Sequence, residues 1–388
     1  MGDSDFHHLD LEKLRKDVEN EKETREPRIR EVRLKDEFTS EGKIRFAEQV
    51  RKQYEKTYGL AGNHSGVQIC PWNKKSVKGQ AVCYKQKFYG IETHRCAQMS
   101  PALAWCTESC TFCWRPMEWF RKTSMHEHEV DDPAYIIEET VKQRRRLVSG
   151  LGGAAGADPK KFKEALDGFP SHWAISLSGE PTIYPKLGEM IKLLKQRKEV
   201  RSIFIVSNGQ DPEAIARLAM EDGLPTQFYL SLQAPDAELF RKINRSVYKD
   251  GWERLNRTLE LMTTLNCRRV IRFTLLKGIN DTKEYFPKFA ALFEKSRVDF
   301  LEIKSYMFLG FSRQRLKFDN MAEHEYIRQW SAKLLEQLPT YTYNNEDAAS
   351  RIVLLKRKDS PYPDAITEGK VPNEEFARDM NGDVWNGH

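Results

Sequence analysis

The sequence predicts an α/β protein built on an open, partial (β/α)6 barrel. Short apolar strand segments alternate with helical segments between residues 97 and 310. The segments between the strands are long enough for the right-handed crossovers that join parallel strands. Six such units can be counted, two fewer than a closed eight-stranded barrel needs. With 388 residues, 39% of them hydrophobic, the chain can bury one large core with additions at its ends.

The chain divides into four stretches. We expect a charged N-terminal extension over residues 1–66, a cysteine-bearing module over 67–96, the barrel over 97–310 and a C-terminal extension over 311–388. An amphipathic helix is predicted in the first stretch, because apolar side chains repeat there every four residues, at Phe46, Val50, Tyr54 and Tyr58. The preceding run REPRIREVRLKDE has the character of solvated surface, with an RNA-facing arm as the alternative.

The barrel strands are predicted from apolar runs that end near turn residues. In order they are SPALAWC, HWAISLSG, SIFIVSNG, QFYLSLQ, RVIRFTLL and FLEIKSY. Helices are predicted for AYIIEETVKQRRRLV, KLGEMIKLLKQRK and KEYFPKFAALFEKS, and again over 322–338, before a strand in SRIVLLKRK. The glycine-rich run SGLGGAAGAD follows a helix and lacks the Gly-Lys-Ser/Thr ending of a phosphate loop, which favours a flexible loop. We expect loose order after Pro361.

Composition excludes several classes of protein. Lys and Arg total 63 against 57 Asp and Glu, a net charge of +6 that permits an RNA partner without requiring one. No apolar run approaches the roughly 20 residues of a membrane span, and the N-terminus shows no secretory signal. We therefore expect a cytoplasmic protein without membrane association, and a monomer. Six of the seven cysteines crowd between Cys70 and Cys113, which indicates a metal centre in a reducing compartment.

The most specific motif is CTESCTFCW, which contains Cys106, Cys110 and Cys113. Thiolates suit iron–sulfur clusters, whereas a four-cysteine zinc site would need one more ligand nearby. Three thiolates on one cube of iron and sulfide leave one iron open to bind another molecule. The spacing, with Phe112 before the last cysteine, resembles the radical S-adenosylmethionine (SAM) superfamily. That resemblance implies a partial (β/α)6 barrel in which the open iron chelates the amino and carboxylate groups of SAM.

Two further sites match that superfamily. The segment Ser178-Gly179-Glu180-Pro181 resembles its glycine-glycine-glutamate motif, which implies that Glu180 accepts a hydrogen bond from the SAM amino group. Ser207 and Asn208 match a position where polar side chains meet the SAM ribose. The alternative for this pair is turn chemistry before Gly209. All three residues follow predicted parallel strands, where ligand sites gather.

A second group of cysteines, Cys70, Cys83 and Cys96, is separated by twelve residues each time. Zinc ribbons use close cysteine pairs, so this spacing argues against zinc. The three residues fit a second cube with an open iron, and buried structural thiols are the alternative. These spacings, the place of the module ahead of Cys106, and ISLSGEPTIYP resemble the 4-demethylwyosine synthases of tRNA wybutosine biosynthesis over roughly residues 40–360. The archaeal branch, which lacks a flavodoxin-like domain, fits best.

This second resemblance implies a reaction, its cofactors and its partners. Members condense N1-methylguanosine at position 37 of tRNA-Phe with pyruvate, using SAM and two [4Fe-4S] clusters. A 5′-deoxyadenosyl radical takes a hydrogen from the N1-methyl group, the methylene radical attacks pyruvate with loss of its carboxyl carbon, and condensation with the exocyclic amine closes the third ring. The missing flavodoxin domain implies a separate one-electron donor protein.

The family pattern also places a Schiff-base lysine two residues after the middle auxiliary cysteine, at Lys85. Lys87 is the rival that the residues alone do not separate from it, and phosphate binding by both is the alternative. Contacts to RNA are expected from basic and aromatic side chains near the barrel mouth. The candidates are Trp114, Arg115, Trp119, Arg121 and Lys122, then Arg144 to Arg146, then Lys356, Arg357 and Lys358. The alternative for each run is an ordinary solvated basic face, and it is favoured for the last two.

Smaller features are interpreted as structural. His126 and His128 are predicted to be an exposed pair and Cys267 a core thiol. Two other classes of function stay open: a radical SAM enzyme with an auxiliary cluster that acts on a peptide or small molecule, and a non-catalytic iron–sulfur or zinc RNA-binding protein. A product that depends on N1-methylated tRNA would exclude the enzyme that acts on a peptide or small molecule. Cleavage of SAM would exclude the non-catalytic RNA-binding protein.

Overall fold

The computed structural model describes residues 37–116, 123–152 and 156–366, and a ten-stranded sheet runs through it. The strands are β3 (Gly59–Ala61), β4 (Ser65–Gln68), β5 (Cys96–Ser100), β6 (His172–Ile175), β7 (Ser202–Ser207), β8 (Gln227–Leu232), β9 (Arg268–Leu275), β10 (Phe300–Ser305), β11 (Tyr341–Asp347) and β12 (Ile352–Arg357). Their order across the sheet is β11-β12-β10-β9-β8-β7-β6-β5-β4-β3. A separate two-stranded hairpin joins β1 (Glu37–Phe38) to β2 (Ile44–Arg45).

The six central strands form the predicted open barrel. Strands β5 to β10 pair in parallel and in chain order, while β3, β4, β11 and β12 extend the two edges by antiparallel pairing. The two edge strands, β3 and β11, do not pair with each other, so the sheet stays open. The sheet takes strands from all four of the stretches named above. The expectation of an α/β partial barrel is confirmed.

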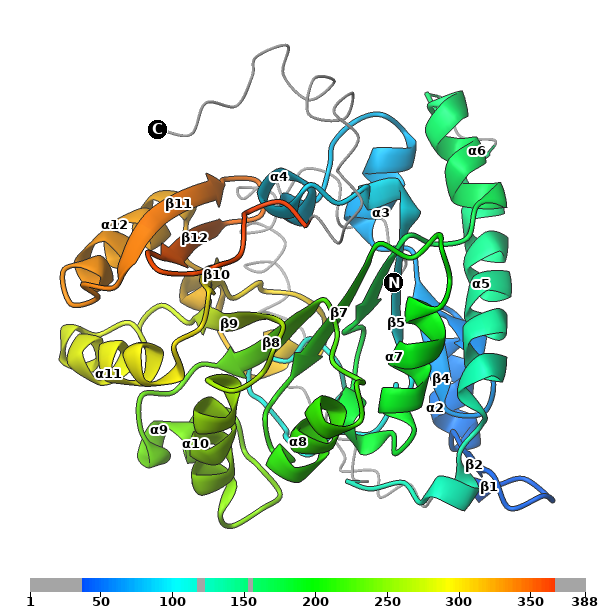
Figure 1. Cartoon of the computed structure of the whole chain (residues 1–388), viewed down its shortest axis with the longest axis horizontal. Helices are drawn as coiled ribbons and strands as arrows, with labels where there is room; N and C mark the ends of the chain where they lie inside the picture. Colours follow the sequence, from blue (N-terminus) through cyan, green and yellow to red (C-terminus); the bar gives the residue numbers. More distant parts are fainter. Residues whose placement is uncertain (1–36, 117–122, 153–155, 367–388) are drawn as a thin grey trace, which may run out of the picture.

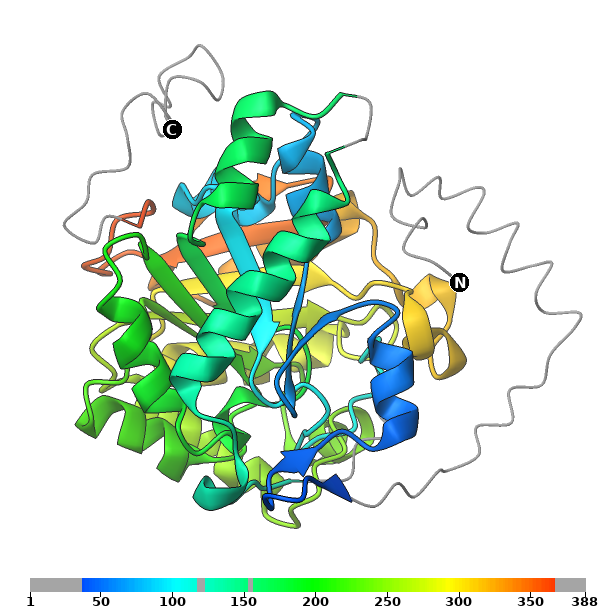
Figure 2. The ribbon, with the colours of Figure 1, turned by 90° about the vertical axis from the view of Figure 1, so that its right-hand side faces the viewer.

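Helices cover the outer face of the curved sheet. Figure 1 shows them following its outside from α5 through α7, α8, α10 and α11 to α12. The helices are α2 (Glu48–Tyr54), α3 (Pro71–Val77), α4 (Tyr84–Tyr89), α5 (Pro133–Ser149), α6 (Pro159–Asp167), α7 (Leu187–Lys195), α8 (Pro212–Met220), α9 (Ala237–Ile243), α10 (Gly251–Met262), α11 (Phe286–Ser296) and α12 (His324–Leu335). Figure 2 shows α5 crossing in front of β4 and β5, with α2 beside it. The four helices predicted from the barrel and the C-terminal extension are present as α5, α7, α11 and α12.

The two largest apolar cores lie on opposite faces of the sheet, and a small third cluster lies where α3 and α6 meet α5. The larger core fills the space between the outer face and the helices. The smaller core lies on the inner face, where the short helix α4 packs Tyr84, Phe88 and Tyr89 against Phe204 of β7 and Tyr229 of β8. The inner face is therefore partly filled by the segment that follows Cys83.

The prediction for the first barrel strand was wrong. The strand covers Cys96–Ser100, and most of the predicted segment SPALAWC lies beyond its end. Pro101 has no N–H for a sheet ladder, and the apolar run after it is a buried loop rather than a strand. Apolar content alone does not separate these two states.

Most of the smaller predicted features lie within the described residues. The N-terminal helix α2 has only seven residues, but all four predicted apolar positions are buried. Cys267 is a buried thiol just before β9, and His126 and His128 form an exposed, stacked pair. Residues 25–36, the centre of the glycine-rich run and the chain after Ile366 lie outside the described residues. No described helix is long and apolar enough to cross a membrane.

Candidate active site

The loop after β5 carries the first cysteine triad at the end where the parallel strands finish. Backbone hydrogen bonds hold this loop to the end of α9, from Ser109 N to Asn244 O (3.1 Å) and from Thr111 N to Ile243 O (2.8 Å). From the C-terminal extension, Arg315 donates to the carbonyl oxygens of Thr111 (3.2 Å), Cys113 and Arg115. Burial raises the pKa of both Cys106 and Cys110 well above the ordinary value for a thiol.

The second triad lies at the opposite end of the strands. Cys96 is the first residue of β5, Cys83 immediately precedes α4, and Cys70 caps α3 by accepting a hydrogen bond from Asn73 N (3.4 Å). The three thiols interact electrostatically with one another, and burial raises the pKa of Cys83 and of Cys96 to about 12. The two predicted triads are therefore each brought together, at opposite ends of one barrel.

The sulfur atoms of neither triad lie as close together as a single metal ion requires. A tetrahedral zinc ion with Zn–S bonds of about 2.3 Å holds its sulfur ligands roughly 3.8 Å apart. Among the described residues, one group of three candidate ligands has all its ligand atoms within 4.8 Å of one another, and it is Glu92, His94 and Glu164, not either triad. That group already contains a 2.7 Å contact between His94 and Glu164, and Arg201 lies 3.1 Å from Glu92.

Glu180 links the ends of two strands beside the first triad. Its Oε2 accepts a hydrogen bond from Asn208 N (2.8 Å), and its Oε1 accepts bonds from Thr182 N (3.2 Å) and Oγ1 (2.8 Å). Asn208 Nδ2 donates to Thr107 Oγ1 (2.9 Å) in the cysteine loop. Ser207 is fully buried, and its Oγ accepts from Gly209 N (3.0 Å), as expected for a turn. Asn208 thus faces the cysteine loop, whereas Ser207 supports the turn and also hydrogen-bonds the Glu180 carboxylate.

The structure separates the two candidate lysines. Lys85 in α4 is 9% exposed, and its Nζ lies 4.3 Å from the ring centroid of Phe204 and 4.5 Å from that of Tyr229 on the inner face of the barrel. Lys87 is exposed. Burial, and secondarily the Arg272 cation, lower the pKa of Lys85 to about 8. Lys85 is thus the one of the pair whose amine lies inside the barrel.

Sequence reasoning missed a polar group on the same inner face. Glu302 of β10 is fully buried and forms an ion pair with Arg272 of β9, with 2.7 Å between Nη2 and Oε2. The signal was present in FLEIKSY and RVIRFTLL, where a charged residue interrupts an apolar strand. Because alternate side chains of a strand share a face, such a residue in a buried strand indicates an inward-facing polar group.

Several candidates for RNA contact have structural roles instead. Arg144 is buried and donates to the carbonyl oxygens of Cys96 (3.0 Å) and His94 (2.7 Å), so it supports the second triad. Arg115 is also buried, between the rings of Tyr58 (4.5 Å) and Trp114 (3.2 Å). For these two arginines the prediction of RNA contact was wrong.

The other candidates divide by exposure. Trp114 is 38% exposed, and Arg145, Arg146 and Lys358 are exposed. Lys356 is half-buried and bonded to Asp364, and Arg357 is buried and bonded to Asp359. Trp119, Arg121 and Lys122 lie outside the described residues.

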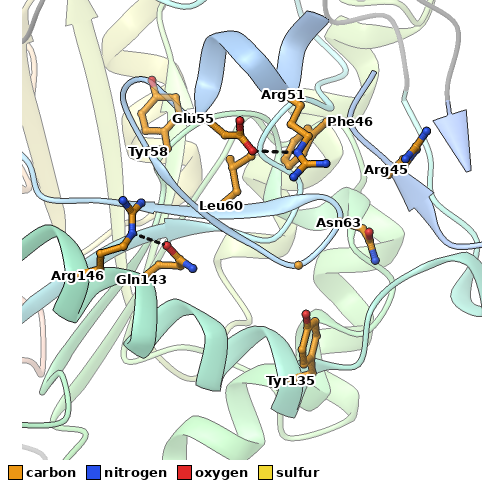
Figure 3. Close-up of a pocket in the computed structure, with 11 residues that line it drawn as sticks. Arg45, Phe46, Arg51, Glu55, Tyr58, Leu60, Asn63, Tyr135, Gln143 and Arg146 are labelled. Carbon is orange, nitrogen blue, oxygen red and sulfur yellow. Dashed lines mark hydrogen bonds and ion pairs between the residues drawn. The ribbon is translucent and has the colours of Figure 1, made fainter. Parts of the chain in front are cut away.

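A basic groove of about 530 Å³ opens beside the cysteine loop. Figure 3 shows Arg45 of β2, Arg51 of α2 and Arg146 of α5 around it, with Tyr135 of α5 at its rim. Tyr58 lines the groove and also contacts Arg115, two residues beyond Cys113. Arg51 is bonded to Glu55 (2.9 Å), an exposed pair that contributes little stability. The groove therefore has a cationic lining, and Tyr58 connects this lining to the cysteine loop.

Family models match two adjoining segments of the chain. The radical SAM superfamily matches residues 101–292, which contain the cysteine loop, Glu180 and strands β6 to β9. A second model, wyosine base formation, matches residues 295–357, which contain β10 to β12. The barrel, the triad and these matches define a radical SAM enzyme, a class that uses SAM and a [4Fe-4S] cluster.

The relatives narrow the class to one family. The S-adenosyl-L-methionine-dependent tRNA 4-demethylwyosine synthase of Pyrococcus horikoshii is 47% identical over 324 residues, which cover 84% of this chain and 92% of that protein. The synthase of Methanocaldococcus jannaschii is 37% identical over 80% of this chain and 96% of its own length. The mouse synthase is 33% identical over 82% of this chain but only 43% of its own length. The chain belongs to the tRNA 4-demethylwyosine synthase family.

Solved structures agree with this assignment. A structure of TYW1 with a lysine–pyruvate adduct bound matches 82% of this chain and 99% of its own, with a TM-score of 0.72 and 35% identity. A crystal structure of archaeal TYW1 matches the same shares with a TM-score of 0.66 and 33% identity. Both the fold and the family expected from the sequence are confirmed.

Proposed function

We propose that this chain condenses N1-methylguanosine at position 37 of tRNA-Phe with pyruvate to form 4-demethylwyosine. The observation that carries the proposal is the position of Lys85, a buried lysine whose amine faces the inside of a barrel with a cysteine triad at each end. Support comes from a relative of the same fold that holds a lysine–pyruvate adduct. The family membership favours this reaction over action on a peptide and over non-catalytic RNA binding.

Two [4Fe-4S] clusters fit the two triads. Cys106, Cys110 and Cys113 would hold the cluster that binds SAM, and Cys70, Cys83 and Cys96 would hold the auxiliary cluster. When bound, the first cluster and SAM supply the 5′-deoxyadenosyl radical that the reaction needs. The residues of this chain would place the SAM amino group near Glu180 and the ribose near Asn208. Ser207 would support the turn after β7 that carries Asn208.

Lys85 is the residue that we propose for binding pyruvate. Its Nζ attacks the keto carbon, a C=N bond forms, and the keto oxygen leaves as water. The rings of Phe204 and Tyr229 beneath the amine exclude bulk water from this position. The keto acid is thereby held on the inner face of the barrel, between the two cysteine triads.

The tRNA would approach from the side of the cysteine loop. The basic groove of Figure 3 supports this, because Arg45, Arg51 and Arg146 carry guanidinium groups that suit phosphate oxygens. Arg45 and Arg51 are paired with Glu37 (3.1 Å) and Glu55 (2.9 Å), and a phosphate would have to replace these weak surface pairs. We assign the groove to the tRNA backbone. A separate one-electron donor protein and a monomeric enzyme complete the proposal.

The proposal is tested by product labelling. Anaerobically reconstituted protein is incubated with SAM, dithionite, N1-methylguanosine tRNA-Phe and carbon-labelled pyruvate, and the tRNA is then digested. We expect label in a modified nucleoside, and we expect Lys85→Arg to lower it at least a hundredfold. Lys87→Arg is the matched control, because Lys87 is exposed on the same helix and should leave labelling within twofold.

Each contrary result removes a different part of the proposal. SAM cleavage without labelled tRNA would keep a radical SAM enzyme but reject the wyosine reaction. Labelling at the wild-type level in both lysine variants would reject Lys85 as the residue that binds pyruvate. Loss of labelling in Lys87→Arg alone would transfer that role to Lys87.

A further inference from the structure

The helix that carries Lys85 is too short to be stable without contacts to the rest of the protein. Helix α4 has six residues, Tyr84–Tyr89, and its N-cap residue Cys83 makes no side-chain capping bond. Isolated helices of this length are unstable in water, because few hydrogen bonds offset the cost of ordering the backbone. The position of Lys85 must therefore come from contacts between α4 and the barrel.

One carboxylate binds both ends of this helix. Tyr89 OH donates to Oε1 of Glu302 (2.8 Å), and Tyr84 OH donates to Oε2 (3.1 Å). Glu302 lies in the middle of β10 and is fully buried on the inner face of the barrel. The two tyrosines flank Lys85 along α4, so the helix is held on either side of the lysine.

Neighbouring strands complete the hydrogen bonds of Glu302. Arg272, its register partner on β9, donates to Oε2 from Nε (3.0 Å) and from Nη2 (2.7 Å), and also to Tyr84 OH. Tyr229 OH of β8 donates to Oε1 (3.1 Å). Because every partner is a donor, the carboxylate is held in its charged form with a fixed orientation.

Tyr229 connects this group to the amine itself. Its hydroxyl is bonded to Glu302, while the face of its ring lies 4.5 Å below Lys85 Nζ. Glu302 therefore fixes the helix that carries the lysine and also the ring on which the amine rests.

We infer that Glu302 is a positioning residue for Lys85, which clamps α4 through Tyr84 and Tyr89 so that the amine reaches the keto carbon of pyruvate. The inference rests on the proposed function, because it assigns a role relative to the lysine–pyruvate adduct. Glu302 does not touch pyruvate. It acts through the two tyrosines and through Tyr229.

The test is borohydride trapping of the adduct in the reconstituted holoenzyme. Borohydride reduces the C=N bond to a stable secondary amine, and mass spectrometry of the peptide that contains Lys85 measures the trapped fraction against pyruvate concentration. We expect Glu302→Gln to lower trapping at subsaturating pyruvate by about tenfold or more. Reductive SAM cleavage per bound cluster should stay within twofold, because the first triad lies at the other end of the strands.

A second variant keeps the ion pair and removes only the clamp. The double variant Tyr84→Phe with Tyr89→Phe retains Glu302, Arg272 and the aromatic packing, and it should lose trapping to a similar extent. It also serves if Glu302→Gln does not fold. Trapping at the wild-type level in this variant would overturn the inference.

The chain offers a matched control nearby. Asp299, just before β10, is also fully buried and pairs with Arg269 of β9 through Nε (3.0 Å) and Nη2 (3.0 Å). Its place in the strand alternation puts this pair on the opposite face of the sheet. Asp299→Asn should leave trapping per folded protein within twofold, and an equal loss in both carboxylate variants would show a general stability effect and overturn the inference.

The proposed function can fail separately. If the wild-type enzyme forms no adduct at Lys85, the assignment of the lysine is wrong, and the inference about Glu302 falls with it. If the wild type is trapped but Glu302→Gln is trapped equally, only the inference about Glu302 is overturned.

Discussion

Gly179 sets how closely the end of β6 approaches the cysteine loop. Its φ is +70°, and a Cβ at this position would lie 1.9 Å from Ala102 O and 2.5 Å from Trp105 O. Glu180 N donates to the same Trp105 carbonyl (2.8 Å). The glycine therefore lets Glu180 and Cys106 belong to one compact site.

We expect Gly179→Ala to disrupt that site. The methyl group must push the loop away from β6, so iron bound after reconstitution should fall at least threefold, and the SAM-induced change in the spectrum of the reduced cluster should disappear. Iron analysis and electron paramagnetic resonance measure the two effects.

Gly278→Ala is the control for backbone strain alone. Gly278 also has a positive φ, +75°, but a Cβ there meets nothing within 4 Å. A left-handed alanine costs about 1–2 kcal/mol in either position. Equal iron content in the two variants would show that strain, and not the close approach to the loop, is responsible.

At the scale of residues, the sequence indicates the candidate ligands more readily than their surroundings. The cysteine spacings and the motif around Glu180 could be identified because they lie within short segments of chain. Lys85 and Lys87 could not be separated, because the distinction depends on which side of a six-residue helix faces the barrel. Glu302 was missed because its partners come from three other elements of the fold.

At the scale of elements, the edge hairpin β3–β4 is pinned by one imidazole. His64 lies between the two strands; its Nδ1 donates to Pro101 O (2.6 Å), and its Nε2 accepts from Asp131 N (2.9 Å). This arrangement requires a neutral ring with the proton on Nδ1. Burial lowers the pKa of His64 below its ordinary 6.5, against the opposing effect of the Asp131 carboxylate.

The hairpin should therefore loosen in acid. A lowered pKa in the folded state means that the stabilisation from neutral His64 is present above pH 6.5 and is lost as the pH falls below it, by at most about 1.4 kcal/mol per pH unit. We expect the melting temperature to drop between pH 7.5 and 5.5. His64→Asn, which keeps a donor for Pro101, should melt lower at pH 7.5 but change less over this range. A variant with the same pH dependence as the wild type would assign the effect to other groups.

The elements also show where sequence patterns fail. The parallel strands β6 to β10 were predicted because each is an apolar run bounded by turn residues. The first strand was displaced by a few residues, since the buried loop around Leu103 is as apolar as a strand. The edge strands β3 and β11 were not predicted, because β3 has only three residues and β11 is the polar run YTYNNED, which lacks an apolar strand pattern.

At the scale of the whole molecule, the two cysteine triads lie at opposite ends of the barrel. The second triad and Lys85 belong to the end where the strands begin, and the first triad with Glu180 belongs to the end where they finish. The basic groove lies outside the barrel, between the N-terminal segment and α5, and Tyr58 in its lining contacts Arg115 of the cysteine loop. A large polyanion can therefore bind without entering the region around Lys85, and only its target base needs to reach the interior.

This arrangement predicts that groove arginines affect tRNA affinity and not the radical chemistry. In the double variant Arg51→Gln with Arg146→Gln, the Kd for tRNA should rise about tenfold at low salt. The slope of log affinity against log salt should become shallower by about one to two, because tRNA binding releases about one counterion fewer for each phosphate contact that is lost. SAM cleavage without tRNA should be unchanged. Arg257→Gln is the control, because Arg257 of α10 is as exposed as Arg51 and is ion-paired to Glu213 of α8 (3.0 Å), away from the groove. If Arg257→Gln weakens binding as much per removed charge as the groove variant does, the attraction is due to overall charge, and the groove is not the docking surface.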